Sequence, residues 1–145
     1  MGLPLWPALD ALTPGLAAVM IAIGLAHIAS GDAFGSPADL PWAIQLWGAR
    51  RHPTQIYETL AAALIFASTL QRPTPYPFPG SAFLRFAAIT AAARLFQEAF
   101  RGDSLLMLGG IRTMQVVSLA VLMLALLGMH LLATRPQVAD SGAGL

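Results

Sequence analysis

The sequence of 145 residues contains no cysteine and no lysine, and only 10% of its residues are charged. Without cysteine the chain has no disulfide, no thiolate metal site and no cysteine nucleophile. Its eight basic residues, all arginine, are nearly balanced by seven acidic residues, which gives a formal net charge of +1. We therefore predict no nucleic-acid partner, because nucleic-acid binding needs a basic patch that this composition does not supply.

Apolar residues dominate what is present: they make up 57% of the chain, and the mean hydropathy is +0.67. A soluble domain carries about 25% charged residues, so we predict an all-α, polytopic integral membrane protein forming one domain over residues 1–145. Four spans of about 20 residues each would use most of this length. The N-terminus has no basic region and carries Asp10, so we expect the first apolar stretch to be retained as a span rather than cleaved as a signal peptide.

The pattern predicts helices over about residues 11–30, 54–70, 81–100 and 113–134. Thr13 followed by Pro14 is typical of a helix N-cap with proline at the first helical position. Residues 31–53 are rich in glycine and proline but contain Trp42 and Trp47, which favours an interfacial or re-entrant loop between the first two helices. Five alanines between residues 87 and 93 predict that the third helix is central to the bundle. We expect residues 135–145 to be disordered.

Polar groups on the third predicted helix fall on one face. Arg94, Glu98 and Arg101 are spaced by four and three residues, so Arg94 and Glu98 can form an intrahelical ion pair. At bilayer depth such a pair is costly unless it lines a hydrated cavity, which favours a functional site over the alternative of an interfacial anchor. Arg85, near the other end of the helix, is typical of a snorkelling anchor.

A second group of polar residues surrounds the start of the helix at 54–70, within the run Arg51-His52-Pro53-Thr54-Gln55-Ile56-Tyr57-Glu58. Gln55 and Glu58 share a side, and Arg51 and His52 stand near the first free amides of the helix, which predicts an anion-binding mouth. The alternative is an ordinary basic flank with a tyrosine of the aromatic belt.

A third group contains His27, near the end of the first predicted helix, and Asp32, five residues further on. Gln115 and Ser118 share a face of the fourth predicted helix. The connections between helices one and two and between helices three and four lie at one membrane surface, so we expect His27 to join the other two groups there. The alternatives are a structural histidine and a helix-to-helix hydrogen bond from Gln115 or Ser118.

These groups, in order, resemble the C-terminal half of the bacterial prolipoprotein diacylglyceryl transferase family over about residues 24–130. Residues 36–44 and 51–58 are similar to its glycine-loop and RHPxQxYE segments, residues 94–101 to its R-x3-E-x2-R helix, and residues 114–118 to its GQxxS element. Gly31 and Gly35 match the glycine loop. The chain has Gly24 and His27 where the family has arginine and asparagine, and Asp32 where it has glutamate.

The resemblance implies that the diacylglyceryl group of phosphatidylglycerol is transferred to the lipobox cysteine of a prolipoprotein, in the bacterial plasma membrane, at a site facing the outer leaflet. Such a reaction needs no metal and no other cofactor. The implied catalytic residues are His27, Asp32, Arg94 and Glu98. The implied substrate-binding residues are Gly31, Gly35, Arg51, His52, Gln55, Tyr57, Glu58, Arg101 and Gln115.

Two other functions stay open at this point. The family's N-terminal half, with its essential tyrosine and histidine, has no counterpart in the sequence, so the chain is alternatively an inactive phospholipid-binding or assembly module, acting as a homo-oligomer or with a partner that supplies the missing helices. A proton or ion path through Glu58, Arg94 and Glu98 is a third interpretation. The positive-inside count places the loops at 31–53 and 101–112 in the cytoplasm, whereas the resemblance places them outside and both termini inside, which we adopt.

Overall fold

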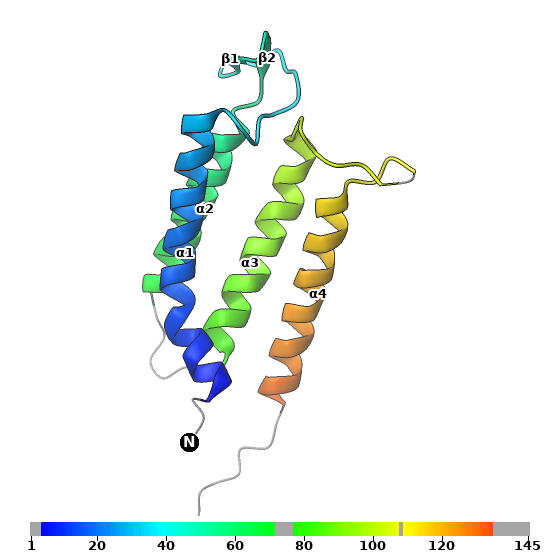
Figure 1. Ribbon diagram of the computed structural model, residues 1–145. Coiled ribbons are helices and arrows are strands. Elements are labelled where there is room, and N and C mark those ends of the chain that lie inside the picture. The colour runs from blue at the N-terminus through cyan, green and yellow to red at the C-terminus, as the bar shows by residue number, and fades with distance from the viewer. Residues whose placement is uncertain (1–3, 72–76, 108, 135–145) are drawn as a thin grey trace, which may run out of the picture.

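The structure is a computed structural model that describes residues 4–71, 77–107 and 109–134. It contains four helices that run side by side (Figure 1). They are α1 (Leu5–Ser30), α2 (Thr54–Leu70), α3 (Ser81–Gln97) and α4 (Thr113–Ala133), with a 3-10 turn, η1 (Glu98–Phe100), after α3. A hairpin of β1 (Ile44–Leu46) and β2 (Ala49–Arg51) lies between α1 and α2. We call the end that carries the hairpin the hairpin end, and the end where α1 begins and α4 ends the terminal end.

Three of the predicted helices are confirmed within a few residues. α2 covers the predicted residues, α4 ends at Ala133, and the predicted third helix finishes as η1. The central position of α3 is also confirmed, because α3 packs against each of the other three helices. Its small residues Ala88 and Ala91 are buried. The buried core between α3 and α4 consists of Leu84 and Ala88 from α3 and Ala125 from α4.

The predicted start of the first helix is wrong. α1 begins at Leu5 rather than near residue 11, and Pro14 lies inside it. Thr13 is therefore not an N-cap; its hydroxyl donates back to the carbonyl oxygen of Leu9 at 2.9 Å. Proline has no N–H to donate to the carbonyl four residues earlier, which bends a helix without ending it where neighbours hold both sides. Figure 1 shows α1 changing direction near its start.

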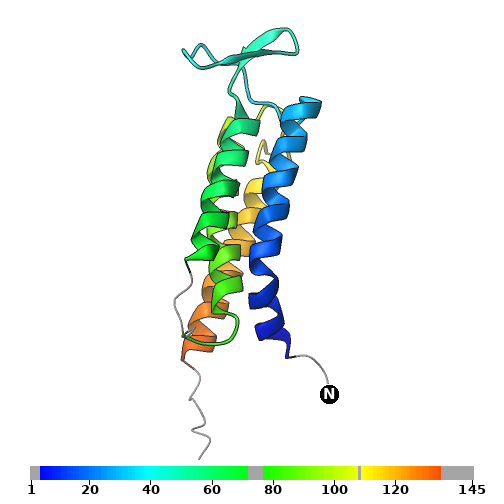
Figure 2. The ribbon, with the colours of Figure 1, turned by 90° about the vertical axis from the view of Figure 1, so that its left-hand side faces the viewer.

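The prediction of an all-α chain is wrong for the loop between α1 and α2. The strands pair antiparallel, with Ile44 opposite Arg51 and Leu46 opposite Ala49. Trp47 and Gly48 form the turn with φ values of 52° and 76°, as expected of a two-residue turn whose central residues both have positive φ. Figures 1 and 2 show the hairpin beyond the ends of the helices, so it does not re-enter between them. An interfacial position stays a prediction.

Two helices of the described part of the chain are long and apolar enough to cross a membrane, by length and composition: α1 with 26 residues and α4 with 21. α2 and α3 have 17 residues each, about 25 Å of helix against a hydrocarbon core of about 30 Å. Large apolar side chains on both long helices point outward, and Leu124 is 66% exposed. This inside-out distribution fits a lipid environment, while the number of four spans stays a prediction.

The terminal end is held by Asp10, whose side chain links α1 to the start of α3. Asp10 is only 6% exposed. Its carboxylate accepts hydrogen bonds from the backbone N–H of Gly80 at 2.7 Å and of Phe83 at 2.9 Å. Gly80 has a φ of 93°, and a Cβ there would lie 2.5 Å from the ring of Trp6. Asp10 thus satisfies amides that the first turn of α3 leaves without partners.

Replacing Asp10 with alanine is expected to destabilise the fold by roughly 2–4 kcal/mol, because two amides at the start of α3 lose their acceptor. Thermal unfolding in detergent measures the effect. The matched control is Asp39→Ala, since the Asp39 side chain is 98% exposed and its removal is expected to leave the melting temperature nearly unchanged. Equal melting temperatures for the two variants would contradict this role for Asp10.

Candidate functional site

A chain of charged side chains from three helices meets at the hairpin end. His27 of α1 contacts Glu58 of α2 at 2.8 Å, and Glu58 lies 3.6 Å from Arg94 of α3. Arg94 lies 3.7 Å from Glu98, which lies 3.9 Å from Arg101. We call these five residues the charged cluster. They come from three separate stretches of the sequence, so the structure joins His27 and Glu58, one member each of two predicted groups, to the predicted group Arg94, Glu98 and Arg101.

Arg94 is the member of the charged cluster whose guanidinium N–H groups make no hydrogen bond within the described structure. Its side chain is 29% exposed, and no hydrogen bond to another described residue engages its guanidinium; it only lies near the carboxylates of Glu58 and Glu98. Glu98 is 1% exposed, and both of its carboxylate oxygens lack hydrogen-bond partners within the described structure. A guanidinium that is aligned by carboxylates but keeps free N–H groups is suited to bind a phosphate through two parallel hydrogen bonds.

His27 and Glu58 form a hydrogen-bonded pair. The Nδ1 atom of His27 lies 2.8 Å from a carboxylate oxygen of Glu58. An ionised carboxylate only accepts hydrogen bonds, so Nδ1 of His27 is the donor in this contact. Both predicted interpretations of His27, a site residue and a structural histidine, fit this contact. The pair has the parts of a general base oriented by a carboxylate.

The loop after α3 fixes Arg101. Asp103 accepts two hydrogen bonds from its guanidinium, from Nε at 2.9 Å and from Nη2 at 2.7 Å. Arg112 donates to the carbonyl oxygens of Glu98 and Arg101 and to the hydroxyl of Ser104. Neither Asp103 nor Arg112 was among the predicted site residues. Loop residues follow no periodic pattern that would relate their spacing to a shared face. The one sequence feature that could have indicated the Arg101–Asp103 contact is that these opposite charges are two residues apart.

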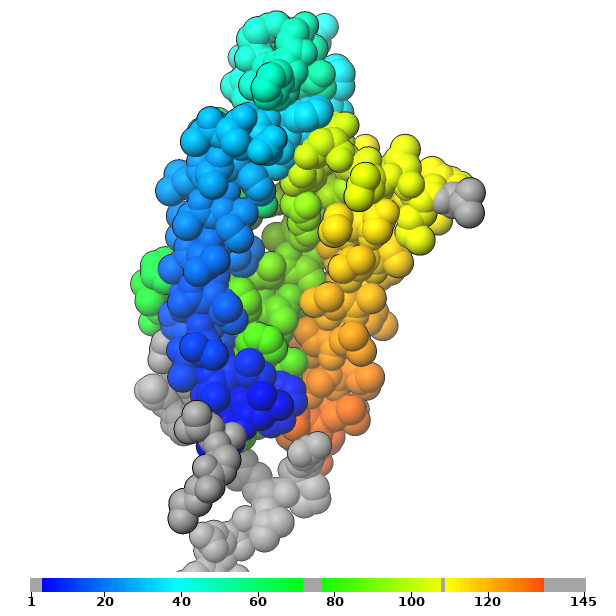
Figure 3. Space-filling view, in the orientation of Figure 1, coloured from blue at the N-terminus to red at the C-terminus, as the bar shows by residue number. Residues whose placement is uncertain are grey.

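Arginines and carboxylates balance in this region. The positive charges of three arginines equal in number the negative charges of three carboxylates: Arg94, Arg101 and Arg112 with Glu58, Glu98 and Asp103. Affinity for an anion therefore depends on free N–H donors rather than on excess positive charge. Figure 3 shows the surface hollowed between the hairpin-end halves of α1 and α3. His27 and Arg94 belong to these halves.

A large apolar groove lies between α2 and α3, beside the cluster. Its volume is about 620 Å³, and polar groups lie only toward its hairpin end, where His52, Tyr57 and Trp42 stand. The indole of Trp42 donates to the Tyr57 hydroxyl at 2.8 Å, and the ring of His52 contacts that of Phe100. Farther along α2 the lining is Leu60, Ala61 and Leu64. The predicted residues His52 and Tyr57 therefore face this groove and not the charged cluster.

Other predicted binding residues shape the loop that surrounds the site. Arg51 donates to the carbonyl oxygens of Leu46 and Gly35, and its guanidinium lies 4.9 Å from the centre of the Phe34 ring. Gly31 ends α1 with a φ of 76°. A Cβ on Gly35 would lie 2.2 Å from the carbonyl oxygen of His52. The structure of the loop therefore accounts for an arginine at position 51 and for glycines at positions 31 and 35.

Three further predicted residues make no side-chain hydrogen bond or ion pair to the charged cluster within the described structure. Gln55 is 2% exposed, and its Oε1 has no hydrogen-bond partner in the described structure. No hydrogen bond or ion pair among the described residues engages the side chains of Asp32 or Gln115. The predicted anion mouth at the start of α2 stays a prediction, but two of its first three backbone N–H groups are already used: that of Thr54 donates to the carbonyl of His52, and that of Ile56 donates to the carbonyl of Pro53.

The arrangement defines a class of protein: an apolar helical bundle with a charged, partly buried site at one end, next to an apolar groove. Comparison with known proteins gives the family. The family profile described as prolipoprotein diacylglyceryl transferase matches residues 1–131, so the chain belongs to that family.

Curated relatives agree. Three similar proteins are named phosphatidylglycerol–prolipoprotein diacylglyceryl transferase. This chain is 32% identical to the protein from Acaryochloris marina over 136 residues, 32% identical to that from Finegoldia magna over 115 residues, and 36% identical to that from Clostridioides difficile over 90 residues. These matches cover 86%, 79% and 62% of this chain but 49%, 46% and 36% of the relatives. The chain thus spans about half the length of the first two. No solved structure gives a significant match.

Proposed function

We propose that this chain carries out the transfer named for its relatives, moving the diacylglyceryl group of phosphatidylglycerol to the lipobox cysteine thiol of a prolipoprotein. The observation that carries the proposal is Arg94, a guanidinium aligned between two carboxylates with its own N–H groups unused. Its donors suit the phosphate of the lipid, and the adjoining apolar groove suits a substrate with long hydrocarbon chains.

The reaction forms one bond and breaks one. The cysteine sulfur attacks the terminal glycerol carbon of the diacylglyceryl group, and the bond from that carbon to the phosphate oxygen breaks, which makes a thioether and releases glycerol phosphate. Negative charge grows on the leaving phosphate, where Arg94 and Arg101 stabilise it. Glu98 lies within ion-pair distance of both arginines and keeps them oriented.

His27 is proposed as the base that takes the thiol proton. In this proposal its Nε2 accepts the proton, and the carboxylate of Glu58 stabilises the imidazolium that forms. Because the thiolate is the nucleophilic form of cysteine, this transfer activates the acceptor. His52 and Tyr57 are proposed to contact the ester end of the diacylglyceryl group at the mouth of the groove.

The proposed location is the bacterial plasma membrane, with the hairpin end at the outer surface. The two long apolar helices support membrane insertion. A prolipoprotein emerges with its lipobox at the outer surface, so the hairpin end has to stand there for the charged cluster to meet its thiol.

The test uses purified protein in detergent, phosphatidylglycerol labelled in its diacylglyceryl group, and a synthetic lipobox peptide. The expected product is a peptide whose mass increases by the diacylglyceryl group, with release of glycerol phosphate. A peptide with serine in place of the lipobox cysteine is the negative control. Protein that binds phosphatidylglycerol but gives no product would reject the transfer and leave a binding function.

The second candidate function is that binding function, and the coverage of the relatives favours it. The chain matches about half of their length, so we propose as the alternative a phospholipid-binding half that acts with a second polypeptide or a second copy. Mixing the chain with a protein that carries the relatives' remaining half is then expected to produce transfer that neither component gives alone.

Replacing His27 with alanine is expected to abolish turnover while leaving phosphatidylglycerol binding within a few-fold of wild type, because the imidazole moves a proton and does not hold the phosphate. General-base catalysis is worth about 100–10,000-fold. Transfer rate and lipid retention are measured on the same preparation. A fall in binding as large as the fall in rate would show that His27 acts by holding the site together.

A further inference from the structure

Two members of the charged cluster, Glu98 and Arg101, lie on a segment that ends a helix without a glycine cap. α1, by comparison, ends at Gly31, which has a φ of 76° and donates its N–H to the carbonyl of His27. At the end of η1, Arg101 is in the extended conformation, with a φ of −74° and a ψ of 141°. The last carbonyl groups of a helix need donors from outside the helix. The conformation of this segment therefore depends on contacts from other parts of the chain.

Arg112, the residue before α4, supplies donors to this segment. Its Nη1 atom donates to the carbonyl oxygen of Glu98, to that of Arg101 at 2.8 Å, and to the hydroxyl oxygen of Ser104 at 3.0 Å. Arg112 is partly buried, and no ion pair within the described residues joins it to a carboxylate. Its positive charge lies against the C-terminal end of α3, which is the negative end of the helix dipole. The guanidinium of Arg112 is thus used to hold the main chain of the segment.

The loop that follows α1 contacts the same segment through its backbone. The N–H of Ser36 donates to the carbonyl of Phe100 at 2.8 Å, and the N–H of Gly102 donates to the carbonyl of Phe34 at 2.9 Å. These bonds lie on either side of Arg101 in the sequence. The side chain of Arg101 is only 13% exposed, so its position follows that of the backbone that carries it.

We propose that Arg112 is a positioning residue, which places the guanidinium of Arg101 for its contact with the lipid phosphate by holding the carbonyls of Glu98 and Arg101. This inference rests on the proposed function and adds to it a residue that touches neither substrate. Arg94 lies on α3 itself, before the segment. Loss of the Arg112 guanidinium is therefore expected to displace Arg101 more than Arg94.

The first test is a double-mutant cycle on transfer from phosphatidylglycerol, at a temperature at which thermal unfolding shows every variant to be folded. Arg112→Gln is expected to lower the rate about 10- to 100-fold, because displacement of a catalytic group by about 1 Å has effects of this order. Its retention of phosphatidylglycerol is expected to stay within a few-fold of wild type, since Arg94 remains in place. The double variant with Arg101→Gln is expected to be as slow as Arg101→Gln alone, because residues that act as a unit are not additive. Two effects that multiply overturn the proposal.

Hydrogen exchange of backbone amides follows the segment directly and needs no turnover. In Arg112→Gln the amides of Arg101 and Gly102 are expected to exchange about tenfold faster than in wild type, because the segment opens more often. Arg112→Lys keeps a positive charge and three N–H donors on one nitrogen, as the three acceptors around Nη1 require. It is expected to restore slow exchange and most of the rate.

These measurements separate failure of the inference from failure of the proposed function. Unchanged exchange at Arg101 and Gly102 in Arg112→Gln overturns the inference whether or not wild type transfers the lipid. A lysine variant that behaves as the glutamine variant does also overturns it. Wild-type protein that gives no product, while Arg112→Gln changes exchange as expected, rejects the transfer and supports the placement of Arg101 by Arg112.

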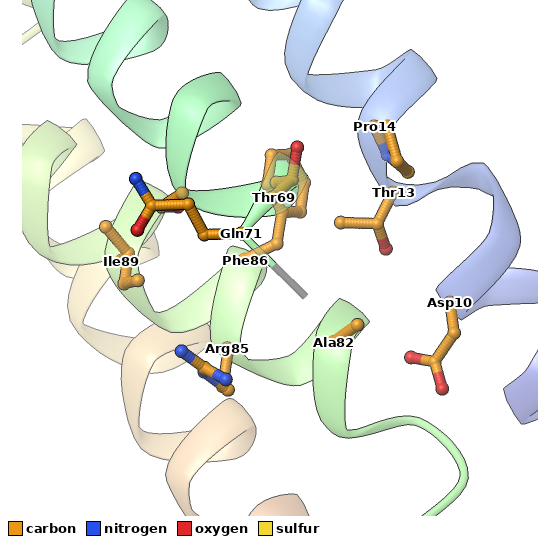
Figure 4. A pocket seen from close by; sticks show the side chains of 10 residues that line it. Asp10, Thr13, Pro14, Thr69, Gln71, Ala82, Arg85, Phe86 and Ile89 are labelled. Carbon is orange, nitrogen blue, oxygen red and sulfur yellow. The ribbon is translucent and has the colours of Figure 1, made fainter. Parts of the chain in front are cut away.

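The matched control is Arg85→Gln, which removes an arginine from the terminal end of α3. Arg85 is exposed and lines a cavity between α1, α2 and α3 (Figure 4). The volume of this cavity is about 30 Å³, which is room for about one water molecule, and no hydrogen bond or ion pair joins the Arg85 side chain to another described residue. We expect wild-type transfer and wild-type exchange at Arg101 and Gly102. Losses as large as those of Arg112→Gln overturn the proposal, because removal of an arginine outside the site would then have the same effect.

Discussion

Replacing Arg94 with glutamine is expected to lower diacylglyceryl transfer about 100- to 1000-fold, the effect of removing a donor aimed at charge that develops in the transition state. Arg94 lies between Glu58 at 3.6 Å and Glu98 at 3.7 Å. Without its charge, two carboxylates face the phosphate binding site with no cation between them. Binding of phosphatidylglycerol is therefore expected to fall as well as the rate.

The measurement is transfer and lipid retention for three variants. Arg94→Lys keeps the charge but loses the planar fork of the guanidinium, so we expect partial activity. Arg50→Gln removes an arginine at the same end of the bundle whose side chain is half exposed, and we expect wild-type activity. If Arg94→Gln binds phosphatidylglycerol as wild type does, both the transferase and the binding-module proposals fail, since both place the phosphate at Arg94.

Helical spacing predicted the part of the site that lies on one element. Residues four apart on a helix are neighbours, and the Arg94–Glu98 contact follows from that rule alone. The scarcity of charge in an apolar chain then singled out Glu58 and Arg101. The pairing of His27 with Glu58 depended on a further step, that both connections lie at one end of the bundle, which the structure bears out.

The remaining contacts had no such signal. Asp103 and Arg112 lie in a loop, where no period relates sequence to position, and their partners are fixed by the path of the chain. The start of α1 was missed because Thr13–Pro14 has the composition of an N-cap, while the role of Asp10 in capping α3, 70 residues away, is tertiary. Such contacts are set by packing, which overrides local preference.

Replacing Gly35 with alanine is expected to have the largest effect on the loop that surrounds the site. A Cβ at this position would lie 2.2 Å from the carbonyl oxygen and 2.6 Å from the Cβ of His52, and backbone atoms cannot rotate away as the end of a side chain can. Gly35 also pairs with Arg101, and the neighbouring Ser36 N–H donates to the Phe100 carbonyl at 2.8 Å. The methyl group therefore pushes the loop away from the segment that positions Arg101.

We expect Gly35→Ala to cost about 3 kcal/mol of stability, at the upper end for overpacking, and to lower transfer roughly 100-fold, because displacement of about 1 Å at a catalytic group has that effect. Thermal unfolding and transfer are measured together. Gly15→Ala is the matched control, since a Cβ there meets nothing within 4 Å and alanine is favoured over glycine inside a helix by roughly 0.5–1 kcal/mol. Wild-type melting and activity in Gly35→Ala would mean that the loop relaxes without moving Arg101, and the positional account of this glycine would be wrong.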